Sequence, residues 1–316
     1  MSKSRREFLV GLAASGAIVT LSSKAFARAG ILCPALNSAL LADPPNSSGV
    51  DFKIGYSAIA WHDQDTQAIN DLSTLGIPGI QLRANVVTEV PDPHALRDML
   101  AQRHLTFVAL SSGTAPLDPE LRQTTIDTHM KNAKYLHEAG GNYLQIVPAG
   151  SKGGSFSAGD AKYEGRFLTE IGKRVADLGH QMSVHNHMGT ISQTPEGLEA
   201  ILNEADPQYV KLELDTAHYL QGGGDPAAAV RKYSKRLLFL HLKDVKDAPT
   251  KGGYEFVELG QGRLDFPAVF EALKSVNFHG WGIVELDGEH VGAVSTPIES
   301  AKISKSYLEQ KLGIRV

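Results

Sequence analysis

The sequence predicts an α/β fold, a single (β/α)8 or TIM barrel, and three observations support this prediction. Eight short apolar runs alternate with longer segments of helical period. The alternation begins at Lys53 and fills the rest of the 316-residue chain, a length close to the roughly 250 residues of a typical barrel. No Gly-x-Gly-x-x-Gly segment opens the first helix, which counts against the alternative, an open doubly wound sheet.

The apolar runs are short and are bounded by Gly, Pro or Asn, as expected of buried strands. In chain order they are 53–60, 79–83, 105–110, 143–147, 181–187, 209–215, 236–242 and 281–286. The segments of helical period follow them at 64–75, 92–103, 119–139, 161–179, 195–204, 225–234, 266–275 and 294–312. Active sites of such barrels lie at the carboxyl ends of the strands, so polar residues late in these runs are candidates for function.

Residues 1–27 have the pattern of an export signal. Arg5 and Arg6 precede an apolar stretch over 11–21, and a small-x-small sequence at 25–27 supplies a cleavage site. The arginine pair indicates a twin-arginine signal, so we expect the twin-arginine translocase to export the folded protein to the periplasm or the medium. The alternative is a basic amphipathic helix, and the apolar stretch is too short for a stable membrane span.

Residues 28–52 are predicted to form a flexible leader, which leaves 53–316 for the barrel. With 42% hydrophobic and 21% charged residues, the chain has the composition of a globular protein. Its net charge of -4 argues against a nucleic-acid partner. Cys33 is the single cysteine, which excludes a disulfide framework, a zinc–cysteine cluster and an iron–sulfur site within one chain.

Four polar residues fall late in four consecutive predicted strands, and we expect them to bind one divalent metal ion. A buried carboxylate or imidazole costs several kcal/mol unless it is paired or binds a metal. The combination suits manganese, which we expect here, with cobalt, iron, magnesium and zinc as alternatives. The structural alternative is a set of hydrogen-bonded core groups. The four residues are His185, Asp215, His241 and Glu285.

Other polar residues near the predicted strand ends are candidates for catalysis or substrate binding. The catalytic candidates are His187, His218, Lys243 and Glu285. The substrate-binding candidates are Trp61, His62 and Gln81. Each has a structural alternative: a histidine can orient a metal ligand, Lys243 can form an ion pair, and Trp61 can cover the core. The remaining histidines are expected at the surface: His94, His104, His129, His137, His180, His279 and His290.

An ordered series of motifs carries a resemblance to a known family. The motifs are 184–190 (VHNHMGT), 214–218 (LDTAH), 223–226 (GGDP), 241–244 (HLKD), 259–266 (LGQGRLDF) and 283–285 (IVE). Over about residues 53–312 the chain resembles the sugar phosphate isomerase/epimerase superfamily, whose members have xylose-isomerase-like TIM barrels. The strand-five motif, together with Trp61, looks more like the inosose dehydratase branch, and is similar to lyases that open 3-keto-glycosides by β-elimination.

The resemblance implies a metal-dependent reaction on a small-molecule carbohydrate. Many members carry a metal-binding glutamate in the strand-five motif that shares acid–base work with the strand-eight glutamate, but His185 stands there in this chain. The remaining asymmetric set suits removal of a proton beside a carbonyl and protonation of a leaving oxygen. The resemblance thus implies a lyase or dehydratase of a keto-sugar, 3-keto-glycoside or keto-inositol, in which His187 or Glu285 takes the α-proton. His218 or Lys243 would assist the leaving group or the enolate.

Several alternatives stay open at this point. The barrel could instead serve a metal-dependent isomerase or epimerase of a free ketose, or a non-catalytic periplasmic sugar-binding protein. Either His185 or His187 could be the strand-five ligand, and His185 could itself be a base. A homo-oligomer is compatible with such a barrel, and the sequence specifies no interface for it.

Overall fold

The computed structural model describes residues 52–150, 155–250, 252–287 and 296–316. Eight parallel strands close into a barrel in the order β1-β10-β7-β6-β5-β4-β3-β2, which confirms the predicted fold class. The barrel strands are β1 (Phe52–Ser57), β2 (Gly79–Arg83), β3 (Thr106–Ala115), β4 (Tyr143–Pro148), β5 (Gln181–His185), β6 (Val210–Asp215), β7 (Leu237–Leu242) and β10 (Gly280–Val284).

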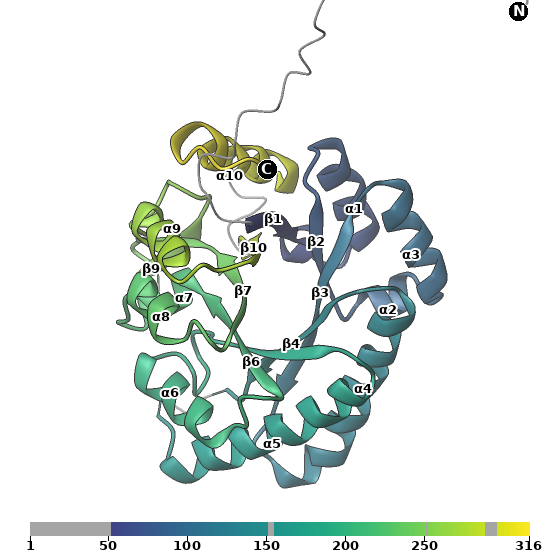
Figure 1. The fold of residues 1–316 in the computed structure, drawn as a ribbon, viewed down its shortest axis with the longest axis vertical. Helices are drawn as coiled ribbons and strands as arrows, with labels where there is room; N and C mark the ends of the chain where they lie inside the picture. Colours follow the sequence, from purple (N-terminus) through teal and green to yellow (C-terminus); the bar gives the residue numbers. More distant parts are fainter. Residues whose placement is uncertain (1–51, 151–154, 251, 288–295) are drawn as a thin grey trace, which may run out of the picture. The chain divides into compact units, whose positions relative to one another are not determined.

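Helices surround the strands on the outside of the barrel (Figure 1). The longer helices are α1 (Asp65–Thr74), α3 (Pro93–Gln102), α4 (Arg122–Glu138), α5 (Ala158–Asp177), α6 (Pro195–Glu204), α8 (Pro226–Lys232), α9 (Phe266–Ser275) and α10 (Pro297–Lys311). Shorter helical turns follow several strands: η1 (Ala58–Trp61), α2 (Val86–Glu89), η2 (Pro119–Leu121) and α7 (Thr216–Gln221). Each crossover thus returns the chain to the same end of the barrel, so the carboxyl ends of the strands meet at one face.

The local sequence explains where several helices begin. Asp92, Thr194 and Asp225 precede α3, α6 and α8, and the side chain of each accepts a backbone N–H from the first turn. A proline follows each of them at the first helical position, where a missing N–H costs nothing. Helix α5 begins with a capping box formed by Ser157 and Asp160.

Apolar residues close the lower part of the barrel interior. The ring of Tyr143 stacks on the ring of Phe239, with centroids 5.6 Å apart and planes 12° from parallel. These two pack with Val108, Ala109, Trp281 and Ile283 into an inner cluster, separate from the larger core between strands and helices. Two residues beyond Tyr143, Phe239 and Ile283, the side chains on the same face of each strand are polar. They are Gln145, His241 and Glu285. The barrel interior is therefore apolar in the layer of Tyr143 and Phe239 and polar in the next layer toward the carboxyl ends of the strands.

Two features of the strands differ from the sequence prediction. Strand β3 continues to Ala115, because a register shift against β4 between Ser111 and Thr114 lets pairing resume beyond the predicted end at 110. An antiparallel hairpin of β8 (Asp244–Asp247) and β9 (Tyr254–Val257) lies between β7 and α9 and was not predicted. Its strands are short and carry charged residues, so they lack the apolar pattern of the barrel strands.

Asp244 anchors the segment that follows the hairpin. Its carboxylate accepts backbone N–H groups from four residues: Val245, Gly260, Gly262 and Leu264. A side chain at position 262 would clash, because a Cβ atom there would lie 2.3 Å from Asp244 Oδ1. The Gly-Gln-Gly sequence at 260–262 is thus a turn wrapped around a buried carboxylate.

His129 was predicted at the surface, and this prediction is wrong. The side chain is 1% exposed, because α4 turns it toward β3. Its Nδ1 lies 2.7 Å from Ser112 Oγ, and its Nε2 lies 3.2 Å from the carbonyl oxygen of Thr114. Burial lowers the pKa of His129 to about 4.

The predicted export signal at 1–27 and the predicted leader up to residue 51 lie outside the described residues. Among the residues that are described, no helix combines the length and the apolar character needed to cross a bilayer.

Candidate active site

The four predicted metal ligands lie within reach of one ion at the carboxyl ends of the strands. One ligand atom from each of His185, Asp215, His241 and Glu285 lies within 4.8 Å of the others, and all four side chains are buried. His241 Nδ1 lies 3.2 Å from Glu285 Oε1 and 3.6 Å from Asp215 Oδ2. The structure thus brings together groups that are up to 100 residues apart in the sequence, at 185 and 285.

The charge and the hydrogen bonding of this group fit a divalent cation. Glu213, Asp215 and Glu285 are buried carboxylates, and the buried ammonium of Lys243 lies 3.0 Å from Glu285 and 2.7 Å from Asp287. Within the described residues, His241 Nδ1 and Asp215 Oδ2 are buried without a hydrogen-bond partner. Imidazole nitrogen and carboxylate oxygen are ligands for manganese, iron, cobalt or zinc, and a divalent ion would offset part of the negative charge of these carboxylates.

The opposite charges in the site outweigh the effect of burial. Burial alone would raise the pKa values of the Asp215 and Glu285 carboxyl groups, but Lys243 and His241 hold both below their usual range. Burial would lower the pKa of Lys243, but Asp287, Glu285 and Asp215 raise it. Lys243 Nζ lies 2.7 Å from Asp287 Oδ2 and 3.0 Å from Glu285 Oε1. Lys243 is therefore a fixed positive charge and cannot release a proton near neutral pH.

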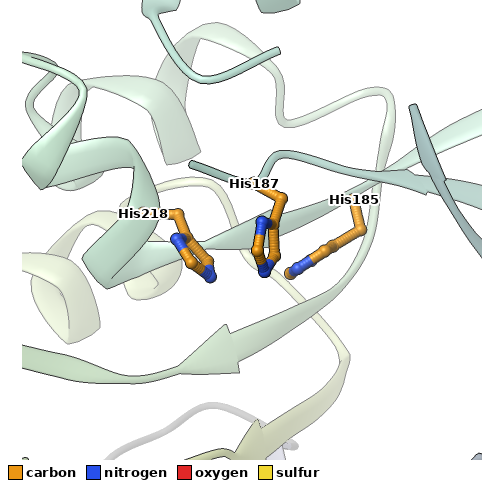
Figure 2. A group of neighbouring side chains, drawn as sticks. All are labelled: His185, His187 and His218. Carbon is orange, nitrogen blue, oxygen red and sulfur yellow. The ribbon is translucent and has the colours of Figure 1, made fainter. Parts of the chain in front are cut away.

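The backbone of Met188 contacts two neighbouring histidines. His187 Nδ1 lies 2.6 Å from the carbonyl oxygen of Met188, so this nitrogen carries the proton and Nε2 is left with a free lone pair. The N–H of Met188 lies 3.2 Å from His218 Nδ1, and the ammonium of Lys243 lies 3.1 Å from His218 Nε2, so both ring nitrogens of His218 face donors. Figure 2 shows the two rings side by side, next to His185, and their centroids lie 4.0 Å apart.

Both of these histidines are held neutral. Burial lowers the pKa of His187, and the nearby His185 and Lys243 lower it further. Burial and the ammonium of Lys243 also hold the pKa of His218 well below its usual value. A neutral His187 can accept a proton at Nε2.

Sequence analysis missed one residue of the site, Glu213. It is fully buried, and its Oε1 lies 2.5 Å from His241 Nε2 and 3.4 Å from His185 Nδ1. The signal was present, because Glu213 stands two residues before Asp215 and so shares its face of the strand. Gln81 was predicted to bind substrate; it lies against the same ring, with its Oε1 2.5 Å from His241 Nε2.

The structure places Trp61 and His62 beside helix α1. Trp61 is 4% exposed, donates Nε1–H to Asp71 at 2.7 Å, and packs edge to face on Tyr56. His62 is exposed and caps η1 with a φ of 56°. Both line a cavity of about 300 Å³ whose lining, among the described residues, includes none of the candidate metal ligands. Their roles in substrate binding remain predictions.

Comparisons with known proteins agree with the barrel and its site. The profile of the family described as "Xylose isomerase-like TIM barrel" matches residues 53–310. Inosose dehydratase of Lacticaseibacillus casei strain BL23 is 28% identical over 302 residues, which are 84% of this chain and 98% of that protein.

Two solved structures share the fold. The IOLI protein, solved with a bound zinc atom, aligns with a TM-score of 0.68 at 19% identity, over 82% of this chain and 97% of its own. The probable 3-DHS dehydratase of Bacillus anthracis has a TM-score of 0.66 at 16% identity, over 81% of this chain and 98% of its own.

A closed parallel barrel with a polar group at the carboxyl ends of its strands defines a (β/α)8 barrel enzyme. The family match covers most of the chain. The protein belongs to the xylose isomerase-like TIM barrel family.

Proposed function

We propose that the protein is a divalent-metal-dependent lyase that removes water or an alcohol from a keto-sugar, a 3-keto-glycoside or a keto-inositol. The observation that carries the proposal is the neutral imidazole of His187, whose Nε2 offers a free lone pair beside the rings of His185 and His218. The similarity to inosose dehydratase over 84% of the chain supports the same reaction class. The metal would be held by His185, Asp215, His241 and Glu285.

The proposed reaction balances with the side chains of this site. His187 Nε2 takes the proton from the carbon next to the ketone, and the electron pair of that bond forms a C=C bond. The bond between the β-carbon and its oxygen breaks, and the departing oxygen takes the proton from His187 and leaves as water or an alcohol. His187 is neutral again at the end of the cycle, and the other product is an α,β-unsaturated ketone.

The remaining groups stabilise the charge that develops on the ketone oxygen. A divalent cation bound by these residues would supply Lewis-acid polarisation of that carbonyl group. The ammonium of Lys243, 3.1 Å from His218 Nε2, would add a fixed positive charge beside it. Lys243 contributes through its charge alone, because the surrounding carboxylates keep it protonated.

Elimination fits this site better than epimerisation. An epimerase that works with two carboxylates removes a proton on one face and returns it on the other. Position 185 carries an imidazole in this chain in place of the second carboxylate. Glu285 therefore has no second glutamate at position 185 with which to share the proton transfers. Single-base chemistry from His187 requires no second base.

The test is an assay of purified, manganese-loaded protein with a 3-keto-glucoside. Release of the aglycone together with an unsaturated sugar is the expected result. An inverted stereocentre without release would make the protein an epimerase, and an unaltered substrate that binds tightly would make it a sugar-binding protein. Asp215→Asn should lower both metal content and turnover. Asp177→Asn, the same change at an exposed position near the end of α5, should lower neither.

We also propose that the protein is exported in its folded form by the twin-arginine translocase. The proposal rests on Arg5 and Arg6, on the apolar stretch at 11–21 and on the small residues at 25–27. The family profile begins at residue 53, so this N-terminal segment lies outside the conserved match.

A further inference from the structure

Glu213 lies in the middle of the group of strands that carries the candidate metal ligands. Strand β6 pairs with β5 on one side and with β7 on the other, and Glu213 is the register partner of His185. Asp215, two residues further along β6, is the register partner of His241. Glu213 therefore points into the barrel one layer below Asp215, between an imidazole from each neighbouring strand.

The carboxylate of Glu213 contacts both imidazoles on the side away from the other ligands. Its Oε1 lies 2.5 Å from His241 Nε2, while His241 Nδ1 faces Glu285 at 3.2 Å and Asp215 at 3.6 Å. The same oxygen lies 3.4 Å from His185 Nδ1. One carboxylate oxygen thus lies against one ring nitrogen of each histidine.

An imidazole that binds a metal must present a bare nitrogen, and its other nitrogen then carries the proton. A carboxylate beside that N–H fixes both the proton position and the orientation of the ring. We propose that Glu213 is a positioning residue that holds His241 with Nδ1 and His185 with Nε2 toward the cation. This inference rests on the proposed metal centre. It assigns to Glu213 the orientation of two of the four proposed ligands, His185 and His241.

The position of Glu213 argues against a purely structural role. Burying a carboxylate inside a barrel is costly, and a well-packed apolar residue of similar size would serve stability at least as well. Phe239, the register partner of Glu213 on β7, belongs to the apolar cluster that also contains Ile283. A carboxylate beside these apolar side chains is useful where imidazole N–H groups need an acceptor, and at His241 Nε2 it lies together with Gln81 Oε1, 2.5 Å from the same nitrogen.

The test is a titration of metal-free protein with Co²⁺, followed by the visible absorption of the bound ion. The wild-type protein and Glu213→Gln are compared, because the amide keeps the shape and loses the charge. The Co²⁺ dissociation constant of Glu213→Gln is expected to rise by about 10- to 100-fold, and the absorption band to change shape, as the two rings reorient. Circular dichroism and thermal unfolding check that the variant is folded.

Glu164→Gln is the control, because it makes the same substitution at another fully buried glutamate, one whose pKa burial raises to about 8. Glu164 lies on α5 and accepts the backbone N–H of Ala149. Its variant should keep the wild-type affinity and absorption band. If Glu213→Gln does not fold, Glu213→Asp replaces it, because the shorter side chain keeps the charge and withdraws it from both rings.

The outcomes separate this inference from the proposed function. Binding of Co²⁺ by the wild type, with unchanged affinity and spectrum in the folded Glu213 variant, overturns the role of Glu213 and leaves the metal centre intact. Failure of the wild-type protein to bind Co²⁺, Mn²⁺ or Zn²⁺ overturns both. Weaker binding with an altered band in the Glu213 variant, and neither change in Glu164→Gln, supports the inference.

Discussion

His187 is the residue whose loss should separate metal binding from turnover. Its Nε2 is the proposed base, and His187 lies outside the group of four proposed ligands, although it shares a second possible metal-binding group with His185 and His218. His187→Gln is expected to lower kcat by about 10²- to 10⁴-fold, because an amide cannot accept the proton. Its metal content should equal that of the wild type. His137→Gln, the same change at an exposed position on α4, should keep full activity, and a fully active His187→Gln enzyme would remove His187 from the mechanism.

His129 makes the stability of the barrel depend on pH in the acid range. Burial lowers its pKa to about 4, whereas the unfolded chain has the usual value of 6.5. Above pH 6.5 His129 is neutral in both states and adds no pH dependence. As the pH falls from 6.5 toward 4, only the unfolded state gains the proton, so the free energy of unfolding falls by about 3 kcal/mol in total.

The measurement for His129 is urea unfolding at pH 7 and pH 4.5 for wild type and His129→Gln. The variant should lose less stability between the two pH values than the wild type does. His137→Gln serves as the control and should lose as much as the wild type. Equal losses in wild type and His129→Gln would show that His129 is not buried in its neutral form.

At the scale of single residues, the sequence predicted the candidate ligands but not the groups that orient them. His185, Asp215, His241 and Glu285 could be found because each ends a strand or stands near its end. The roles of His187 and His218 depend on which side of the Met188 peptide faces each ring, and strand periodicity does not carry that information.

At the scale of elements, Gly222 controls how α7 ends. A Cβ atom at this position would lie 1.8 Å from the backbone oxygen of Gln193, in the segment before α6. Gly222→Ala is therefore expected to lower the free energy of unfolding by about 1–3 kcal/mol, because a backbone oxygen cannot move aside without shifting its loop. Differential scanning calorimetry or urea unfolding would measure the change.

Gly159→Ala is the matched control for this substitution. Gly159 lies in the first turn of α5, and the nearest atom to an added Cβ is Ser157 Oγ at 3.4 Å. Alanine should stabilise the protein there by about 0.5–1 kcal/mol, since it removes the entropy of a helical glycine. Equal effects of the two substitutions would contradict the clash at position 222.

The sequence predicted the eight barrel strands because each contains a short, mostly buried apolar stretch bounded by turn residues. The hairpin of β8 and β9 escaped prediction because pairing between its own polar strands, and the backbone contacts of Asp244, hold it in place. Neither interaction leaves a hydrophobic pattern. The extension of β3 depends on a register shift, which is a property of two strands together rather than of one segment.

At the scale of the whole molecule, the cation should contribute to stability. Without it, the buried carboxylates of Glu213, Asp215 and Glu285 depend on the ammonium of Lys243 and on protonation of His241, whose pKa these carboxylates raise well above its usual value in spite of burial. Stripping the metal with a chelator should lower the Tm. Adding Mn²⁺ at 100 times its dissociation constant should restore about 2.7 kcal/mol. The Tm of Asp215→Asn should rise far less when Mn²⁺ is added. A wild-type Tm that does not change with Mn²⁺ would contradict the proposed centre.

Export can be tested on the whole chain in a bacterial host. Replacing both Arg5 and Arg6 by lysine keeps the charge but removes the arginine pair of the proposed signal. The variant should remain in the cytoplasm, while Lys3→Arg should still reach the periplasm or the medium. Cell fractionation followed by immunoblotting measures the distribution. Equal export of both variants would rule out the twin-arginine route.

The pairing of β1 with β10 links the centre to the order in which the chain is made. The barrel closes only when the first strand meets the last, from Phe52 opposite Gly280 to Tyr56 opposite Val284. Glu285 is the next residue, so the final ligand arrives together with the final strand. A growing chain on the ribosome therefore has neither a closed barrel nor a complete set of ligands until both form at once. A cation bound in the proposed centre would then mark a chain whose synthesis and barrel closure are both complete.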